Sequence, residues 1–228
     1  MTPDLPARLA DVDARIADAA RRAGRDPGAI TRIVVTKFHP VSLVDDLVRL
    51  GVRDVGENRQ QELTAKTAEV SAADLRWHFI GQAQANKARA IRAAASAVHS
   101  IDRERIADAF DAAGADGDDL LDVFLQVNLT EDEGRGGVAP ADLERLAEHT
   151  AGCRSLRVRG VMAVAPLDEE AAEAFDRLAE YSRRLRAVVP DAEWISAGMT
   201  ADFAEAIAVG ATHLRIGSAI TGPRPPRG

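Results

Sequence analysis

The stretch "RIVVTKFHPVSLVDDLVRL", from Arg32 to Leu50, holds one strand followed by one helix. The run 33–35 is β-branched and Pro40 closes the segment, which is typical of a short buried strand that stops abruptly. Beyond the proline, apolar residues recur with the spacing of an amphipathic helix: Leu43, Val44, Leu47, Val48 and Leu50. The stretch is therefore one unit of an α/β protein, and its strand ends on a lysine, Lys37.

The same rhythm recurs along the chain. After a first helix over residues 9–22, apolar runs alternate with helical patterns, and the runs are too apolar to face water on one side. The expected strands are 33–37, 53–58, 76–81, 97–102, 122–128, 157–165, 193–198 and 213–218. Eight such units in about 200 residues predict a single (β/α)₈ TIM barrel. A doubly wound open sheet is the alternative, but it rarely has eight strands without a glycine fingerprint after the first.

No linker interrupts this pattern, so we expect one domain over residues 1–228, with a flexible tail at about 222–228. The net charge of −7 argues against general binding to nucleic acids or anionic membranes. No apolar run approaches the roughly 20 residues of a membrane helix, and the N-terminus lacks the apolar core of a signal peptide. The single cysteine, Cys153, excludes an intramolecular disulfide. We therefore expect a cytoplasmic protein.

The barrel prediction places function where the strands end, because barrel enzymes carry their active sites at the C-terminal ends of their strands. Lys37 stands at such an end. A lone lysine there normally extends its ammonium group into water. The alternative is a lysine in the barrel mouth that forms a Schiff base with a carbonyl, its amine made more nucleophilic by partial burial. Position alone leaves both interpretations open.

The last two strands carry a candidate phosphate site. Barrels often bind phosphate at the loops after strands seven and eight, where backbone N–H groups at a helix N-terminus meet the anion. Gly198 and Gly217 would let the backbone approach closely, and Ser196, Thr200 and Ser218 carry hydroxyl groups. Taken singly, each of these residues is more simply explained as a helix cap or a turn glycine. Combined with a strand-end lysine, they indicate a phosphorylated carbonyl cofactor, pyridoxal phosphate.

Two further residues could contact such a cofactor. Arg215 lies two residues before Gly217 on the eighth strand, so both face the same side. Its guanidinium could reach the pyridine nitrogen and keep it unprotonated, which would leave a poor electron sink. An ion pair inside the barrel, for example with Glu57, is equally compatible. Asn58 could bond the cofactor ring or the substrate, or cap the helix that follows it.

Other polar residues give weaker signals. His78 is a single histidine on an apolar strand and is more simply a core residue. The five histidines and one cysteine show no metal-ligand spacing, so no metal site is predicted. The basic, amide-rich segment 81–92 is best explained as a solvated helix.

Several motifs, in order, resemble those of the YggS-like pyridoxal phosphate homeostasis proteins: "VVTKFHP", "VGENRQQEL", "WHFIGQAQANK", "VHSID", "LQVNL", "RGVMAV" and "SAGMTADFAEAIAVGATHLRIGSAI". The resemblance spans residues 33–220. It implies a barrel similar to the N-terminal domain of alanine racemase, with pyridoxal phosphate on Lys37. The other residues that it implies bind the cofactor are Asn58, Ser196, Gly198, Met199, Thr200, Arg215, Gly217 and Ser218. The chain departs from the family motifs at Phe38, His39, Ala83 and Thr221, which affects pocket shape and ligand access.

The resemblance further implies a protein that binds, buffers and delivers the cofactor without robust catalysis, with apo pyridoxal phosphate enzymes as candidate recipients. A weak amino-acid racemase is the alternative, and an aldolase-like barrel is a third. Racemases need a second domain and a tyrosine opposite the lysine. Here the chain ends about ten residues after the last expected strand, and its only tyrosine, Tyr181, falls in an expected surface helix. We therefore expect a monomeric carrier rather than an enzyme.

Overall fold

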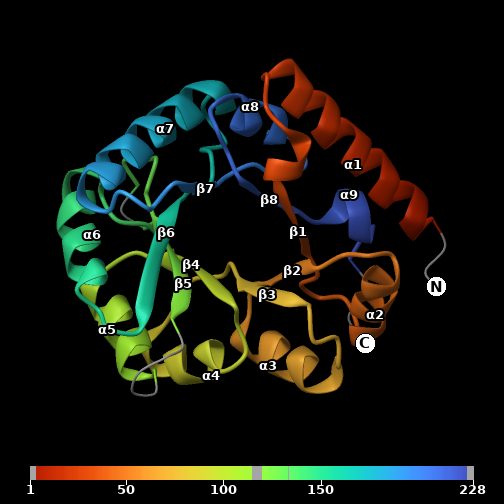
Figure 1. The fold of residues 1–228 in the computed structure, drawn as a ribbon, viewed down its shortest axis with the longest axis horizontal. Coiled ribbons are helices and arrows are strands. Elements are labelled where there is room, and N and C mark those ends of the chain that lie inside the picture. Colours follow the sequence, from red (N-terminus) through yellow and green to blue (C-terminus); the bar gives the residue numbers. More distant parts are fainter. Residues whose placement is uncertain (1–3, 115–119, 133, 225–228) are drawn as a thin grey trace.

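Eight parallel strands close a barrel in the computed structural model, which describes residues 4–114, 120–132 and 134–224 (Figure 1). Neighbouring strands follow the chain order, and the last strand closes the ring by pairing with the first. The strands are β1 Thr31–Val35, β2 Asp54–Glu57, β3 Arg76–Phe79, β4 Ala97–Ile101, β5 Leu121–Gln126, β6 Leu156–Met162, β7 Trp194–Ser196 and β8 His213–Ile216. The predicted TIM barrel is confirmed, and the open sheet is wrong.

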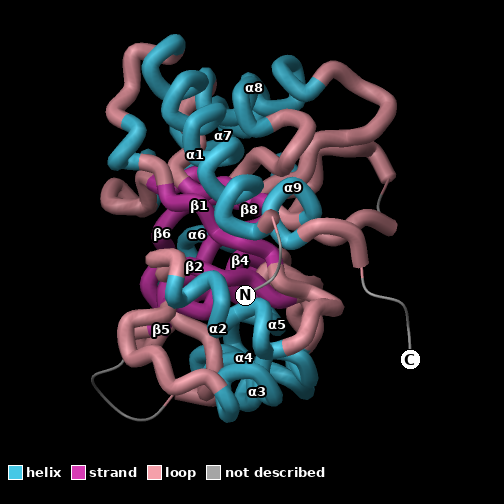
Figure 2. Tube along the Cα trace, turned by 90° about the vertical axis from the view of Figure 1, so that its right-hand side faces the viewer, coloured by secondary structure: helices cyan, strands magenta, loops and turns pink. Residues whose placement is uncertain are grey.

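Helices surround the strands, and Figure 2 shows this arrangement from the side. They are α1 Leu5–Arg22, α2 Val41–Arg49, α3 Gln60–Glu69, α4 Ala88–Arg92, α5 Glu104–Ala112, α6 Leu143–Ala151, α7 Ala171–Val188, α8 Phe203–Ala208 and α9 Ser218–Thr221, with short 3₁₀ turns at Pro27–Ala29, Ala85–Lys87 and Pro140–Asp142. The first helix begins at Leu5 rather than at residue 9, because the first turn tolerates its proline and Leu5 itself is buried. No helix in the described ranges is long and apolar enough to cross a membrane.

The main apolar core lies between the strands and the helices. It joins strand residues such as Val34 and Val55 to helix residues such as Leu47 and Phe175, all of them fully buried. Burial of apolar surface on this scale is the main favourable term in folding.

Every expected strand runs one to three residues past the end of the observed one. Buried residues continue into the loops beyond the strands: Thr36, for example, follows β1 and is fully buried. The sequence pattern cannot distinguish a buried loop residue from a strand residue. The polar residues expected at strand ends therefore lie in the loops at the barrel mouth.

Candidate functional site

A cavity of about 620 Å³ opens in the barrel mouth, among the loops that follow β1, β2, β7 and β8. This volume is in the range of small-molecule sites. Seven of the nine predicted site residues line it: Lys37, Asn58, Met199, Thr200, Arg215, Gly217 and Ser218. The structure thus brings together residues that the sequence spreads from one end of the chain to the other.

Lys37 lies half-buried in a tight turn just after β1. The next residue, Phe38, has a φ angle of 69°, in the left-handed region that a bulky side chain rarely adopts. Helix α3 holds this turn. The Glu62 carboxylate accepts a hydrogen bond from the Phe38 N–H at 2.7 Å, and the Lys66 ammonium donates to the Thr36 carbonyl at 2.8 Å. Lys37 is therefore presented to the cavity by a turn whose backbone is fixed on both sides.

A buried ion pair lies behind the same turn. Oε1 of Glu57, at the end of β2, accepts hydrogen bonds from Lys66 Nζ and from Thr36 Oγ1, each at 2.6 Å. Burial raises the pKa of Glu57, although the hydrogen bonds from Lys66 and Thr36 act in the opposite direction. Glu57 thus pairs with Lys66, and the ion pair with Arg215 considered from the sequence is wrong.

Asn58 is positioned by a close approach between two loops. A Cβ atom added to Gly81, after β3, would lie 1.9 Å from the Asn58 carbonyl oxygen, so only glycine fits there. Arg59 rather than Asn58 occupies the N-cap position of α3, so the capping role considered for Asn58 is wrong. Within the described part of the chain, the buried Oδ1 of Asn58 has no hydrogen-bond partner. The side-chain oxygen of Asn58 is therefore a buried acceptor that lacks a donor among the described residues.

Arg215 forms part of the cavity wall and is only 5% exposed. Its Nη1 donates to the carbonyl and to Oγ of Ser196, each at 2.7 Å, and its Nη2 donates to the Ala163 carbonyl at 2.8 Å. These are contacts with neutral oxygen atoms. Burial lowers the pKa of Arg215 to about 10, so the guanidinium is still protonated at neutral pH.

Ser196 and Gly198 lie behind the cavity rather than in its lining. Ser196 is fully buried, and its Oγ bonds both to Arg215 and to Nδ1 of His99, the latter at 2.8 Å. Gly198 has a φ angle of 92°, and a Cβ there would come within 2.8 Å of the Ala206 Cβ on α8. The two residues shape the wall from behind, through Arg215 and through packing of the loop on α8.

Three cations surround the Phe38 ring at the cavity edge. Lys37 Nζ lies 5.9 Å from the ring centroid, and the guanidinium carbons of Arg59 and Arg224 lie at 5.0 and 3.8 Å. This edge is therefore locally positive in a chain whose net charge is −7. Arg224 belongs to the expected flexible tail at 222–228, of which residues 225–228 lie outside the described part.

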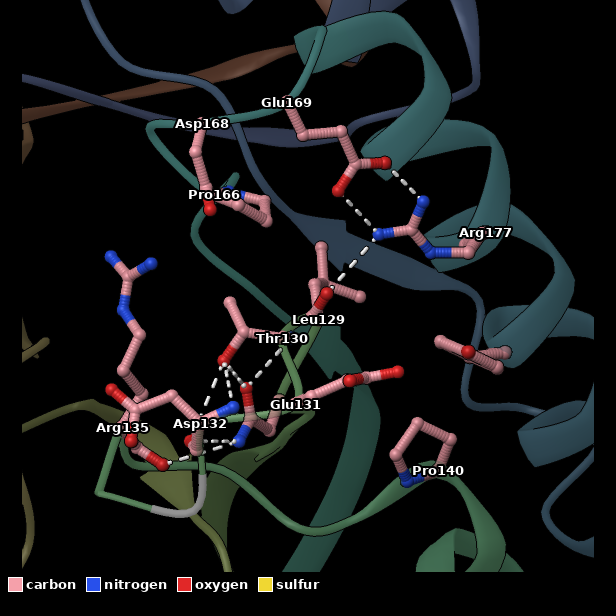
Figure 3. A pocket seen from close by; sticks show the side chains of 12 residues that line it. Leu129, Thr130, Glu131, Asp132, Arg135, Pro140, Pro166, Asp168, Glu169 and Arg177 are labelled. Atoms are coloured by element: carbon pink, nitrogen blue, oxygen red, sulfur yellow. Dashed lines mark hydrogen bonds and ion pairs between the residues drawn. The ribbon is translucent and has the colours of Figure 1, made fainter.

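A second hollow, of about 850 Å³, lies at the loops after β5 and β6 (Figure 3). There Arg177 forms a bidentate ion pair with Glu169 and donates to the Leu129 carbonyl at 3.1 Å. Tyr181 lines this hollow and not the Lys37 cavity. None of the described residues that line it is a lysine, so this hollow does not contain the predicted Schiff-base residue.

Asp108 on α5, His149 on α6 and Cys153 just beyond α6 come together, although their spacing gave no metal-binding pattern. Their ligand atoms lie within 4.8 Å of one another, and His149 Nε2 is 2.6 Å from Asp108 Oδ1. In Figure 1 these helices lie across the barrel from α9, which adjoins the Lys37 cavity. The group is separate from the predicted site.

The sequence of this chain matches the family described as "Alanine racemase, N-terminal domain" over residues 9–225. Two proteins named pyridoxal phosphate homeostasis protein, from Mycobacterium tuberculosis and Pseudomonas aeruginosa, are 39% and 42% identical to it. The alignments cover 97% and 95% of this chain and 93% and 94% of those proteins. The chain belongs to the pyridoxal phosphate homeostasis protein family. Among solved structures, PipY of Synechococcus elongatus with pyridoxal phosphate bound matches with a TM-score of 0.80 and 33% identity, over 91% of this chain and all of that one.

Several residues of this family member escaped the sequence analysis because their partners are distant in the chain. Lys66 holds the Lys37 turn from 30 positions away, and His99 contacts Ser196 from 97 positions away. His78, interpreted as a core residue, is buried and bonds to His99 and to Asp54. Local spacing carries no signal for such contacts, since only the closed barrel brings them together.

Proposed function

We propose that the cavity holds pyridoxal 5′-phosphate through a Schiff base with Lys37, and that the protein buffers and delivers this cofactor without robust catalysis. The observation that carries the proposal is a half-buried lysine in the wall of a ligand-sized cavity that is also lined by two arginines and three hydroxyl side chains. The name of the relatives and the cofactor bound to PipY support it.

The cavity residues fit the chemical groups of this cofactor. Lys37 supplies the amine for the aldehyde: the C=N bond forms and the carbonyl oxygen leaves as water. Thr200 and Ser218 supply hydroxyl groups for the phosphate, and the cations around Phe38 favour an anion at this edge. The unpartnered Oδ1 of Asn58 is the kind of polar atom that a bound ligand would satisfy.

Arg215 disfavours chemistry that needs a strong electron sink, such as most transaminations and decarboxylations. When bound, pyridoxal phosphate supplies an electron-withdrawing ring that acts most strongly when its pyridine nitrogen is protonated. Arg215 is protonated at neutral pH and arginine only donates hydrogen bonds, so a nitrogen beside it must accept and stays unprotonated. Such a site binds the cofactor but draws electrons weakly.

The position of the only tyrosine argues against a two-base racemase. A two-base racemase needs a second proton carrier opposite its lysine, whereas Tyr181 lines the other hollow. We therefore propose a carrier with apo pyridoxal phosphate enzymes as recipients. That it is monomeric and cytoplasmic, and has neither a membrane nor a nucleic acid as partner, stays a prediction.

Titration of cofactor-free protein with pyridoxal phosphate tests the binding, followed by absorbance. We expect saturable binding that Lys37→Ala abolishes and that Lys87→Ala leaves intact. Incubation of the loaded protein with L-alanine and other L-amino acids tests the catalytic alternative. We expect no D-isomer above the level produced by free cofactor, and turnover well above that level would favour the racemase.

A further inference from the structure

A continuous series of hydrogen bonds leads from the cavity wall through the barrel interior. Arg215 Nη1 lies 2.7 Å from Ser196 Oγ, which lies 2.8 Å from His99 Nδ1. His99 Nε2 lies 2.9 Å from His78 Nδ1, and His78 Nε2 lies 3.0 Å from Asp54 Oδ1. All five residues are buried, and each comes from a different strand: β8, β7, β4, β3 and β2.

The two ends of the series fix its direction. Arginine has no acceptor, so Arg215 donates to Ser196 Oγ. Burial raises the pKa of Asp54, but hydrogen bonds from His78 and Arg76 outweigh this effect and lower it to about 2. Asp54 is therefore a carboxylate at neutral pH and can only accept, so Nε2 of His78 carries the hydrogen.

The middle of the series follows from these ends. A His78 ring that carries a single hydrogen, on Nε2, can only accept at Nδ1, so His99 donates from Nε2. Burial lowers the pKa of His99 well below its ordinary value and keeps the ring neutral. Nδ1 of His99 is then an acceptor for the Ser196 hydroxyl. Every donor in the series then has an acceptor, and each hydrogen bond is donated in the direction from Arg215 toward Asp54.

We propose that Ser196, His99 and His78 are positioning residues. They link Arg215 to the remote carboxylate of Asp54 and hold the Arg215 guanidinium in the cavity wall. A buried cation whose direct contacts are neutral oxygens needs compensation. The Asp202 carboxylate supplies part of it, since its charge acts to raise the pKa of Arg215. Aligned hydrogen-bond dipoles that end at the negative charge of Asp54 add to it. The series does not conduct protons to the cavity, because Arg215 has none to gain. The inference rests on the proposed function, in which Arg215 faces the cofactor ring.

His213 offers a matched control inside the same cluster. Its ring centroid lies 6.2 Å from that of His99 and 6.3 Å from that of His78, and it is also buried. However, its Nδ1 bonds to Thr212 Oγ1 at 2.8 Å, outside the series. Replacement of His213 removes a buried imidazole from the core and leaves the link to Arg215 in place.

The first test measures the histidine tautomers by ¹⁵N NMR in the cofactor-free protein. We expect neutral rings at His78 and His99, each with its hydrogen on Nε2. In Ser196→Ala, the His99 Nδ1 resonance should move toward that of a nitrogen without a hydrogen bond, while His213 stays unchanged. A hydrogen on Nδ1 of His99, or a charged ring, would overturn the series.

The second test compares cofactor affinity among variants whose folding is checked by thermal unfolding. We expect Ser196→Ala and His99→Leu to weaken pyridoxal phosphate binding about tenfold, the scale of one lost hydrogen bond to a charged group. His213→Leu should change it less than about twofold. Equal affinity of Ser196→Ala and the wild type would overturn the positioning role. Failure of the wild type itself to bind would instead refute the proposed function, and the tautomers would still decide the series.

Discussion

At the scale of single residues, the site depends on backbone positions that tolerate little change. Asn58 can approach β3 only because Gly81 has no side chain, since a Cβ there would overlap the Asn58 carbonyl oxygen at 1.9 Å. The Lys37 turn similarly requires a left-handed Phe38. The chemistry of the cavity is thus set by the neighbours of its polar residues as much as by those residues themselves.

Gly81→Ala should therefore damage both folding and binding. The added methyl group must push the two loops apart, which we expect to lower the free energy of unfolding by roughly 1–3 kcal/mol and to weaken pyridoxal phosphate binding. Urea unfolding and cofactor titration measure the two effects. Gly24→Ala is the control: Gly24 has a φ angle of 66° and nothing within 4 Å of its added Cβ, so stability should fall without a change in affinity. Normal binding by Gly81→Ala would contradict this account of Asn58.

At the scale of elements, α3 supports the Lys37 turn from outside the cavity. Its Lys66 contacts both the Thr36 carbonyl and the Glu57 carboxylate, so one ammonium group joins α3, β2 and the loop after β1. The side chains of Lys66 and Glu57 are 8% and 0% exposed. A buried pair of this kind is costly to break, because the remaining charge has no partner.

Lys66→Met should destabilise the protein by about 3–5 kcal/mol, the usual result of leaving one buried charge unpaired. Burial already raises the pKa of Glu57, so below that pKa Glu57 is neutral and no unpaired charge is left in the core. The loss of stability in Lys66→Met should therefore grow as the pH rises through the pKa of Glu57. Denaturant unfolding at pH values below and above the pKa of Glu57 measures the effect. Adding Glu57→Gln should recover much of the loss, and a double variant as unstable as Lys66→Met would contradict the ion-pair explanation.

The strand–helix units were predictable element by element, because each buried strand and amphipathic helix has its own local pattern. The cavity residues at the strand ends were predictable for the same reason. By contrast, the places of Ser196 and Gly198 behind the wall, and the contacts of Lys66 and His99, depend on closure of the barrel. Arg215 shows the boundary clearly: its position on β8 followed from the sequence, but its partners Ser196 and Ala163 did not.

At the scale of the whole molecule, the barrel interior contains opposite charges at its two ends. Arg215 lies at the mouth, and Asp54, the first residue of β2, pairs with Arg76 at the other end. His99 and His213 lie in the interior between them, and burial lowers the pKa of both rings, that of His213 to about 3. Protonation of this interior should therefore govern unfolding in acid.

Asp54 makes this expectation quantitative. Its folded-state pKa of about 2 lies below the ordinary value of 3.8, so its contribution is fully present above about pH 4 and is lost as the pH falls toward 2. The difference between these two pKa values corresponds to a contribution of roughly 2 kcal/mol to the free energy of unfolding. Urea unfolding of the wild type and Asp54→Asn should show a difference in stability at pH 6 that shrinks by about this amount near pH 2. A difference independent of pH would contradict the assignment.

The most direct test of the central claim is reductive trapping of the bound cofactor. The chain contains three lysines, Lys37, Lys66 and Lys87, and Lys66 is buried in its ion pair with Glu57. The protein is saturated with pyridoxal phosphate, reduced with borohydride and digested, and the labelled peptide is identified by mass spectrometry. We predict a phosphopyridoxyl group on Lys37 alone. A saturated protein that carries the label on Lys87 or on the N-terminal amine, with Lys37 unmodified, would contradict the proposal.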